Sequence, residues 1–198
     1  VTFSKTLGGG KASISGYIVR PYVFEKTYGS LANALVHSTT YSGMGEECYT
    51  AIEALNILVD EGFLEKARSL GEYLLSGMTE LKAKHSGIIR DARGLGLLCI
   101  FELHPVSGVI GKNLLKKIPD VDRLLLGLIP AAIVSELFKK HDILKNTGGR
   151  EDNLFVNPAL IVTKEEIDRF IDSLDKVLSG NLYALIVKLA SNMMKITL

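Results

Sequence analysis

The sequence predicts an α/β protein made of two units, of which the second is a smaller α+β domain with helices on an antiparallel sheet. Two consecutive stretches, 46–60 and 63–84, carry apolar residues at helical spacing. Two apolar runs of strand length, 88–93 and 97–103, follow them and are joined by a turn that contains glycine. The helix-breaking pair Glu61-Gly62 lies between the two predicted helices and separates the units.

The first unit is expected to begin with the last residues of a strand, 1–3. Residues 13–19, after a glycine triplet, have the composition of a second strand. Residues 21–26 are expected to form a short helix, because proline at their start suits the first helical turn. A loop rich in small and polar residues, 28–38, then leads to the first of the two long helices.

The second unit continues beyond its two strands with an irregular stretch, 105–122. Residues 123–140 have a helical pattern, within which Pro130 predicts a kink or a later helix start. Residues 154–156 are expected to add a short strand.

Two further helices close the chain. Residues 164–178 form an amphipathic helix in which Thr163 is the predicted N-cap and Glu166 completes a capping box. An additional apolar helix is expected over 181–195. No internal repeat interrupts this order.

The composition excludes several classes of protein. A chain of 198 residues can bury one sizeable core, and 47% hydrophobic with 23% charged residues is ordinary for a globular protein. The formal net charge of +1 gives no reason to expect a nucleic acid or an anionic membrane as partner. The sequence contains no secretory signal and no stretch long enough to span a bilayer. We therefore expect a cytoplasmic protein.

The cysteines and the first residue add two expectations. Cys48 and Cys99 lie in apolar helix and strand patterns, which favours buried thiols in a reducing compartment over a disulfide or a metal site. The sequence begins with Val1 inside an apparent strand. We therefore expect the C-terminal part of a longer enzyme, or a fragment of one.

Lys5 is the strongest candidate for chemistry. It follows a short strand pattern and precedes the triplet Gly8-Gly9-Gly10, whose backbone can approach a ligand closely. Burial at the end of a strand would disfavour the ammonium form, and a neutral amine is what Schiff-base chemistry requires. The alternative is an ordinary surface lysine. A phosphate-binding Walker loop is excluded, because Lys11 is followed by alanine.

Four motifs stand in a fixed order along the chain. They are the lysine–glycine segment Phe3–Gly10, the Thr-aromatic-Gly stretch His37–Gly43, the Arg-Gly-x-Gly-Leu element Arg90–Leu97 with the strand end Phe101–Leu103, and the segment Pro158–Thr163. Together they resemble the subgroup III aminotransferases, the pyridoxal-phosphate (PLP) enzymes that include the ornithine, 4-aminobutyrate and putrescine aminotransferases. The resemblance extends from Val1 to about Leu178.

This resemblance implies a fold and a division of the chain. The fold would be the C-terminal half of a PLP-dependent transferase of the aspartate-aminotransferase type (fold type I), comprising the end of the large-domain sheet and a small α+β domain. Residues 1–62 would complete the PLP-binding large domain, and residues 63–180 would form the small domain. Residues 181–198 would be an extra helix that the family pattern does not include.

The resemblance also implies an activity, which is PLP-dependent transamination between an amine or amino acid and an aldehyde or keto acid. Lys5 would hold PLP as a Schiff base and then move a proton between the substrate carbon and the cofactor. The enzyme would be a homodimer with shared active sites and no metal. Two alternatives stay open: another PLP reaction on the same fold, such as that of an aminomutase, or a non-catalytic fragment or partner.

Thr40 is the second residue with an implied role. The threonine at this place in the family binds the cofactor phosphate, and it does so from the neighbouring subunit. The alternative is a loop hydroxyl that caps the following helix, a role that Thr39 or Ser42 could fill equally well.

Two further positions, Arg93 and Phe155, correspond to arginines in the family, and they are interpreted differently. Arg93 is expected to be structural, pairing with a carboxylate or with loop carbonyls. Phe155 stands where many family members carry an arginine that grips the substrate α-carboxylate. An aromatic ring cannot do so, which implies a substrate such as a diamine or an aldehyde with an aliphatic chain. The alternative is a register shift, with Arg150 taking the role.

Overall fold

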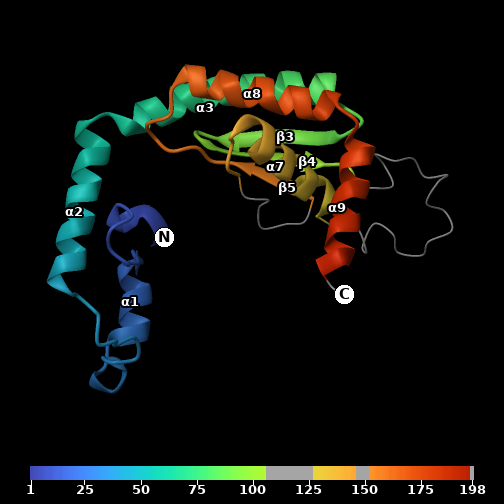
Figure 1. Ribbon diagram of the computed structural model, residues 1–198. Coiled ribbons are helices and arrows are strands. Elements are labelled where there is room, and N and C mark those ends of the chain that lie inside the picture. The colour runs from blue at the N-terminus through green and yellow to red at the C-terminus, as the bar shows by residue number, and fades with distance from the viewer. Residues whose placement is uncertain (106–126, 146–151, 197–198) are drawn as a thin grey trace. The chain divides into compact units, whose positions relative to one another are not determined.

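The computed structural model describes residues 1–105, 127–145 and 152–196, with side chains up to residue 189 (Figure 1). The chain forms two compact units, Val1–Leu64 and Glu65–Leu198, and each is described by itself. The domain limits expected from the sequence, 1–62, 63–180 and 181–198, stay a prediction.

The first unit is built mainly of short elements. In chain order they are β1 (Thr2–Phe3), η1 (Lys5–Gly8), β2 (Gly16–Tyr17), α1 (Pro21–Tyr28), η2 (Leu31–Asn33) and α2 (Gly45–Asp60). β1 and β2 pair antiparallel, with Thr2 opposite Tyr17 and Phe3 opposite Gly16. The strand expected over 13–19 comprises only Gly16 and Tyr17. The helix expected over 46–60 is confirmed and begins one residue earlier, at Gly45.

The turn η1 packs against the middle of α2. Ala51 is the buried residue of α2, and a Cβ added to Gly9 would lie 3.2 Å from the Cβ of Ala54. Gly9 has φ = 60°, a left-handed conformation that glycine adopts without steric cost. Small residues on both sides therefore allow the lysine-bearing turn to approach this helix closely.

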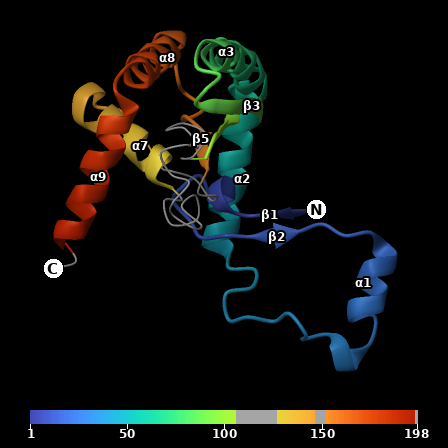
Figure 2. The same ribbon diagram turned by 90° about the vertical axis from the view of Figure 1, so that its right-hand side faces the viewer.

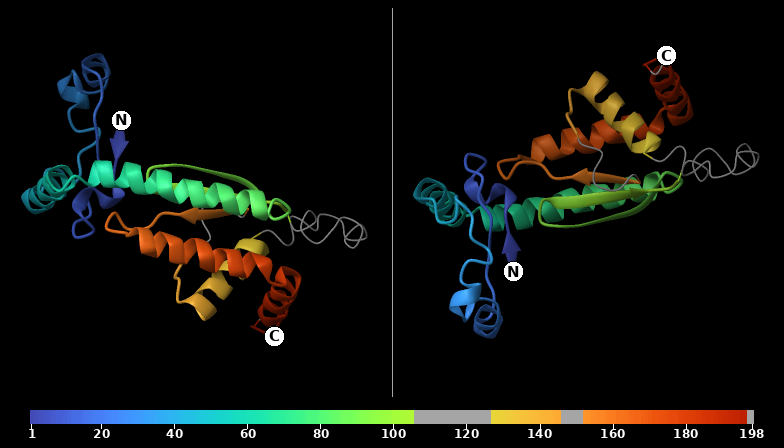
Figure 3. Two further views of the ribbon diagram at one scale, coloured as in Figure 1. Left: turned by 90° about the horizontal axis from the view of Figure 1, so that it is seen from above. Right: turned by 90° about the horizontal axis from the view of Figure 1, so that it is seen from below.

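The second unit is a three-stranded antiparallel sheet with helices. Its described elements are α3 (Phe63–Lys84), β3 (Ile89–Leu95), β4 (Leu98–Leu103), α7 (Leu128–His141), β5 (Asn153–Val156), α8 (Lys164–Ser179) and α9 (Leu182–Ile196). The strand order is β3-β4-β5. α3 and α8 run side by side over one face of the sheet (Figures 2 and 3).

The core of this unit lies between the sheet and its helices. Alternation along β4 buries Cys99, Phe101 and Leu103, as expected when one face of a strand is covered. The helices contribute apolar residues that are at most 5% exposed, among them Leu74, Met78, Ile133, Leu137, Leu174, Leu182 and Ile186. Because its residues Leu182 and Ile186 belong to this core, α9 packs as part of the second unit.

Several local expectations are confirmed. α3 has the limits that the apolar spacing indicates, and Pro130 lies in the first turn of α7, which begins late at Leu128. Thr163 Oγ1 accepts a hydrogen bond from the Glu166 backbone N–H at 3.2 Å, and Glu166 Oε2 accepts one from the Thr163 N–H at 2.9 Å. The irregular stretch after Pro105 lies outside the described residues.

Candidate functional site

Lys5 opens the turn η1 at the end of β1. Its φ of 63° lies in the left-handed region, which residues with a Cβ rarely adopt and which costs about 1–3 kcal/mol. The expectation that Lys5 lies beside a buried strand is not met, because Lys5 is exposed within this chain. The reason is that β1 pairs only with the two-residue strand β2, so no wider sheet covers it in the described part of the unit.

A hollow of about 490 Å³ lies beside this lysine. It is lined by Lys5, Gly10, Lys11, Ala12, Ser13, Ile14 and Ser15. Gly10 has φ = 73°, and an added Cβ there would meet no atom within 4 Å, so the backbone is open to a ligand. The described residues of this lining include two amines, from Lys5 and Lys11, and two hydroxyls, from Ser13 and Ser15, but no carboxylate. This set suits a phosphorylated carbonyl compound, since a cation attracts the phosphate and an amine can add to the carbonyl.

Thr40 lies in the exposed turn before α2. The neighbouring hydroxyls bond locally: Thr39 N–H donates to Ser42 Oγ at 3.2 Å, and the two side-chain oxygens are 3.1 Å apart. The N-cap of α2 is Met44, and no side chain caps the helix. The alternative role of Thr40, Thr39 or Ser42 as helix cap is therefore not found.

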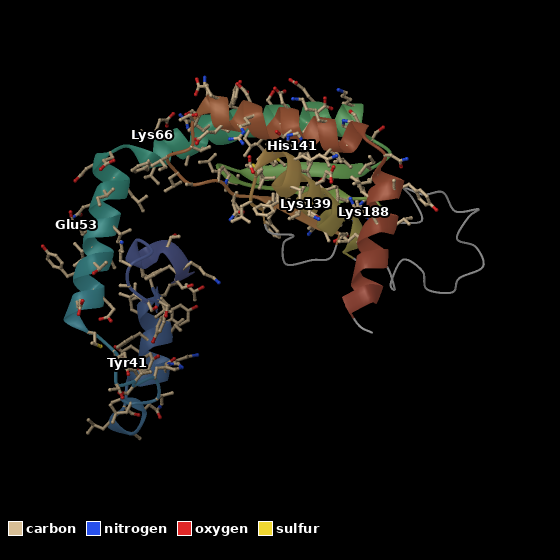
Figure 4. The ribbon with its side chains drawn as sticks, viewed as in Figure 1. Tyr41, Glu53, Lys66, Lys139, His141 and Lys188 are labelled. Atoms are coloured by element: carbon tan, nitrogen blue, oxygen red, sulfur yellow. The ribbon has the colours of Figure 1, made fainter. Side chains whose placement is uncertain are left out.

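Lys5 and Thr40 are not brought together within one chain. The turn that carries Lys5 packs near Ala54, nine residues beyond the start of α2 at Gly45, which corresponds to about 14 Å along a helix axis. Thr40 precedes that start. Figure 4 shows its neighbour Tyr41 beyond the lower end of α2, whereas Glu53 lies near the middle of that helix.

Phe155 lies in the second unit, on the edge strand β5. It is half-buried and pairs with Ile100, which in turn pairs with Arg93 on β3. It lines a pocket of about 580 Å³ between β5, the residues after α7 and the start of α8. Arg93 donates hydrogen bonds to Asp91 at 2.9 Å and to Glu102 at 3.0 Å, in agreement with its expected structural role. Arg150 lies outside the described residues.

The pocket beside Phe155 also holds charged residues that sequence reasoning missed. Lys145 lines it, and burial lowers the pKa of this lysine to about 8. Arg169 lines it as well, and its Nη2 donates to the backbone oxygen of His141 at 2.6 Å. Helical periodicity places Arg169 on α8, but nothing in the pattern indicates that it meets the end of α7.

A cluster of aromatic rings in the first unit was likewise not predicted. Tyr28 Oη is hydrogen-bonded both to Tyr17 Oη and to His37 Nδ1. His37 belongs to one of the four sequence motifs, but its partners are nine and twenty residues away and follow no helical or strand period. The described residues contain no cluster of three or more metal-ligating side chains, and no described helix is long and apolar enough to cross a membrane.

The chain resembles known proteins over most of its length. The family model described as Aminotransferase class-III matches residues 1–178. Over 175 residues the chain is 28% identical to a putrescine aminotransferase of Pectobacterium atrosepticum. The matched region covers 88% of this chain and 32% of that protein.

Solved structures agree on the fold. An S-selective transaminase from Arthrobacter sp. with alanine bound has a TM-score of 0.72 at 22% identity, covering 91% of this chain and 39% of that one. The Plasmodium falciparum ornithine delta-aminotransferase has a TM-score of 0.67 at 23% identity, covering 89% and 39%. The chain thus spans between about a third and two fifths of the length of these relatives. The predicted fold, the C-terminal region of a fold type I transaminase, is confirmed.

Proposed function

Because this chain belongs to the class III aminotransferase family, whose members depend on PLP, we propose that it is the C-terminal part of a PLP-dependent aminotransferase. The reaction would move an amino group between an amine or amino acid and an aldehyde or keto acid. The observation that carries the proposal is the open hollow beside Lys5, where a primary amine, a second cation, two hydroxyls and bare glycine backbone meet. Its volume is in the range of small-molecule sites.

Lys5 is the proposed cofactor-binding and catalytic residue. Bound PLP would supply an electron sink for the electrons left on the substrate carbon. The Nζ of Lys5 would attach the cofactor between turnovers and would take the proton from the substrate carbon that bears the amine. The left-handed backbone of Lys5 supports this assignment, because strained residues of this kind concentrate at functional sites.

Thr40 is the proposed phosphate ligand, contributed by the second subunit of a homodimer. Two observations support this role. No hydrogen bond is found for the Thr40 hydroxyl among the described residues, and α2 does not use it as a cap. In addition, Thr40 and the turn of Lys5 are separated along α2 within one chain, so one subunit alone does not bring them together.

Phe155 is the proposed determinant of substrate class. It stands where many family members carry the arginine that binds a substrate carboxylate, and it lines the pocket of about 580 Å³. A carboxylate desolvated against this phenyl ring would receive neither a charge partner nor hydrogen-bond donors from the Phe155 side chain, which is costly. We therefore propose a substrate without an α-carboxylate at that place, such as a simple amine or a diamine.

The cellular location is the last part of the proposal. Cys48 and Cys99 are not joined in a disulfide. Cys99 is buried, and desolvation raises the pKa of its thiol. The thiol therefore stays protonated at neutral pH and resists oxidation, because the thiolate is the reactive form. Two unpaired thiols suit a reducing compartment, and we propose the cytoplasm.

The test of Lys5 is chemical and does not require activity. The intact protein is incubated with PLP, reduced with borohydride, digested and mapped by mass spectrometry. The cofactor is expected on the peptide that contains Lys5. Lys5→Ala should abolish labelling, while Lys11→Ala, which removes the other amine of the same hollow, should retain it. Label on Lys11 in the unmodified protein would refute the assignment.

A further inference from the structure

Three rings in the first unit form a connected cluster, here called the Tyr–His clasp: Tyr17 on β2, Tyr28 at the end of α1, and His37 in the loop that follows. Tyr28 Oη lies between the other two polar atoms and is hydrogen-bonded to both. The His37 ring also packs edge-on against Tyr28, with centroids 5.8 Å apart at 60°, and against Tyr17, at 6.4 Å and 68°. The clasp thus joins three separate elements.

The loop segment 30–43 has little else to hold it. All of its residues are exposed, so it buries no apolar side chain. Its own hydrogen bonds are local, such as Ser38 N–H to Leu35 O at 3.1 Å and Ser42 N–H to Thr39 O at 3.1 Å. Among the described residues, the Tyr28–His37 bond is the only hydrogen bond that joins this segment to the chain before it.

We propose that the Tyr–His clasp is a positioning device that holds segment 30–43 so that Thr40, three residues after His37, is presented to the cofactor phosphate. This inference rests on the proposed role of Thr40. A loop that is ordered before it binds loses less conformational freedom on binding, so fixing it raises affinity without any new contact to the ligand. Tyr28 and His37 are therefore positioning residues, and they need not touch the cofactor.

The role of Tyr17 follows from the same geometry. Its hydroxyl is hydrogen-bonded to that of Tyr28, and this hydrogen bond raises the pKa of the Tyr28 phenol above its ordinary value. A hydroxyl that both accepts and donates is held in one orientation, and linked hydrogen bonds strengthen one another. Phe24 adds a ring contact to Tyr28 from the same helix, with centroids 5.1 Å apart.

The first experiment measures the PLP dissociation constant of the intact protein. Tyr28→Phe keeps the ring and deletes the hydroxyl, and we expect PLP to bind about three- to tenfold more weakly, the effect of losing a neutral hydrogen bond or two. Tyr22→Phe is the matched control, because Tyr22 is an exposed tyrosine on the same helix outside the clasp. His37→Asn places an amide oxygen near the position of Nδ1 and should stay close to the unmodified protein, whereas His37→Ala should match Tyr28→Phe.

The second experiment separates positioning from general stabilisation. In a double-mutant cycle, Tyr28→Phe should weaken PLP binding much less when Thr40→Val is already present, because the clasp acts through Thr40. Amide hydrogen exchange in segment 30–43 should quicken in Tyr28→Phe, while exchange in α2 stays unchanged.

The outcomes distinguish the two proposals. If Thr40→Val weakens PLP binding and Tyr28→Phe does not, the clasp inference is wrong and the role of Thr40 stands. Full additivity in the cycle would also overturn the clasp, because it would show that Tyr28 acts by another route. If Thr40→Val leaves PLP affinity unchanged, the proposed phosphate contact is wrong, and the clasp inference falls with it.

Discussion

Asp175 on α8 ties that helix to the end of α3, and its replacement tests the packing of the second unit. Its Oδ1 lies 2.7 Å from Nε2 of His85, and its Oδ2 accepts a hydrogen bond from Nζ of Lys84 at 2.6 Å. The His85 side chain is only 9% exposed, whereas that of Lys84 is 58% exposed. Asp175→Asn removes the charge and leaves the shape.

The expected loss follows from these exposures. The Lys84 pair is screened by water and contributes little, at most about 1 kcal/mol. The His85 contact is sheltered, and a hydrogen bond to a charged acceptor contributes about 1.5–3 kcal/mol. We therefore expect Asp175→Asn to lower the free energy of unfolding of the second unit by about 2–3 kcal/mol.

The assay follows protection of the β4 amides against hydrogen exchange across a urea series, because β4 lies in the second unit and reports on it alone. Asp172→Asn is the matched control. Asp172 is an exposed acid on α8 with no hydrogen bond or ion pair among the described residues, and its replacement should change stability by less than about 0.5 kcal/mol.

The pH dependence gives the result that would refute the reasoning. Hydrogen bonds from Lys84 and His85 hold the pKa of Asp175 below its ordinary value of 3.8. A depressed carboxyl pKa stabilises the folded state above the unfolded value, and this contribution is lost as pH falls through the folded pKa. The difference between Asp175→Asn and the unmodified protein should therefore be full at neutral pH and shrink below about pH 4. A difference that is the same at pH 3 and pH 7 would show that the carboxylate charge is not the cause.

Two further predictions concern packing and substrate choice. Gly71→Ala should destabilise the second unit by about 1–3 kcal/mol in the same urea assay, although alanine favours helices, because its Cβ would lie 2.3 Å from the backbone of Gly96. Gly77→Ala is the control and should cost less, since its Cβ would meet only the side chain of Ile171, at 3.1 Å; equal losses would contradict this account. Phe155→Arg in the intact enzyme should shift the ratio of kcat/KM for α-amino acids over simple amines by about ten- to a hundredfold, the effect of one charge-assisted hydrogen bond. If α-amino acids are already the better substrates of the unmodified enzyme, the assignment at Phe155 is wrong.

Local sequence determined the elements whose signals lie within a few residues of one another. The limits of α3 follow from apolar spacing, and the start of α8 follows from the Thr163–Glu166 capping box. Pro130 predicted a kink or a late start of this helix, and the late start is found for an equally local reason: a proline is tolerated in the first turn of a helix but not in its interior. The four motifs together likewise indicated the family, because each is a short run of neighbouring residues.

The tertiary structure decided everything that depends on residues distant in sequence. It showed that Lys5 is exposed within this chain, because the strand before it finds only a two-residue partner. It brought His85 to Asp175, 90 positions away, and joined Tyr28 to both Tyr17 and His37. Helix caps and apolar periods involve residues within a turn or two of one another, so the local sequence specifies them. Contacts such as that of His85 with Asp175 depend on how whole elements pack, which no local pattern specifies.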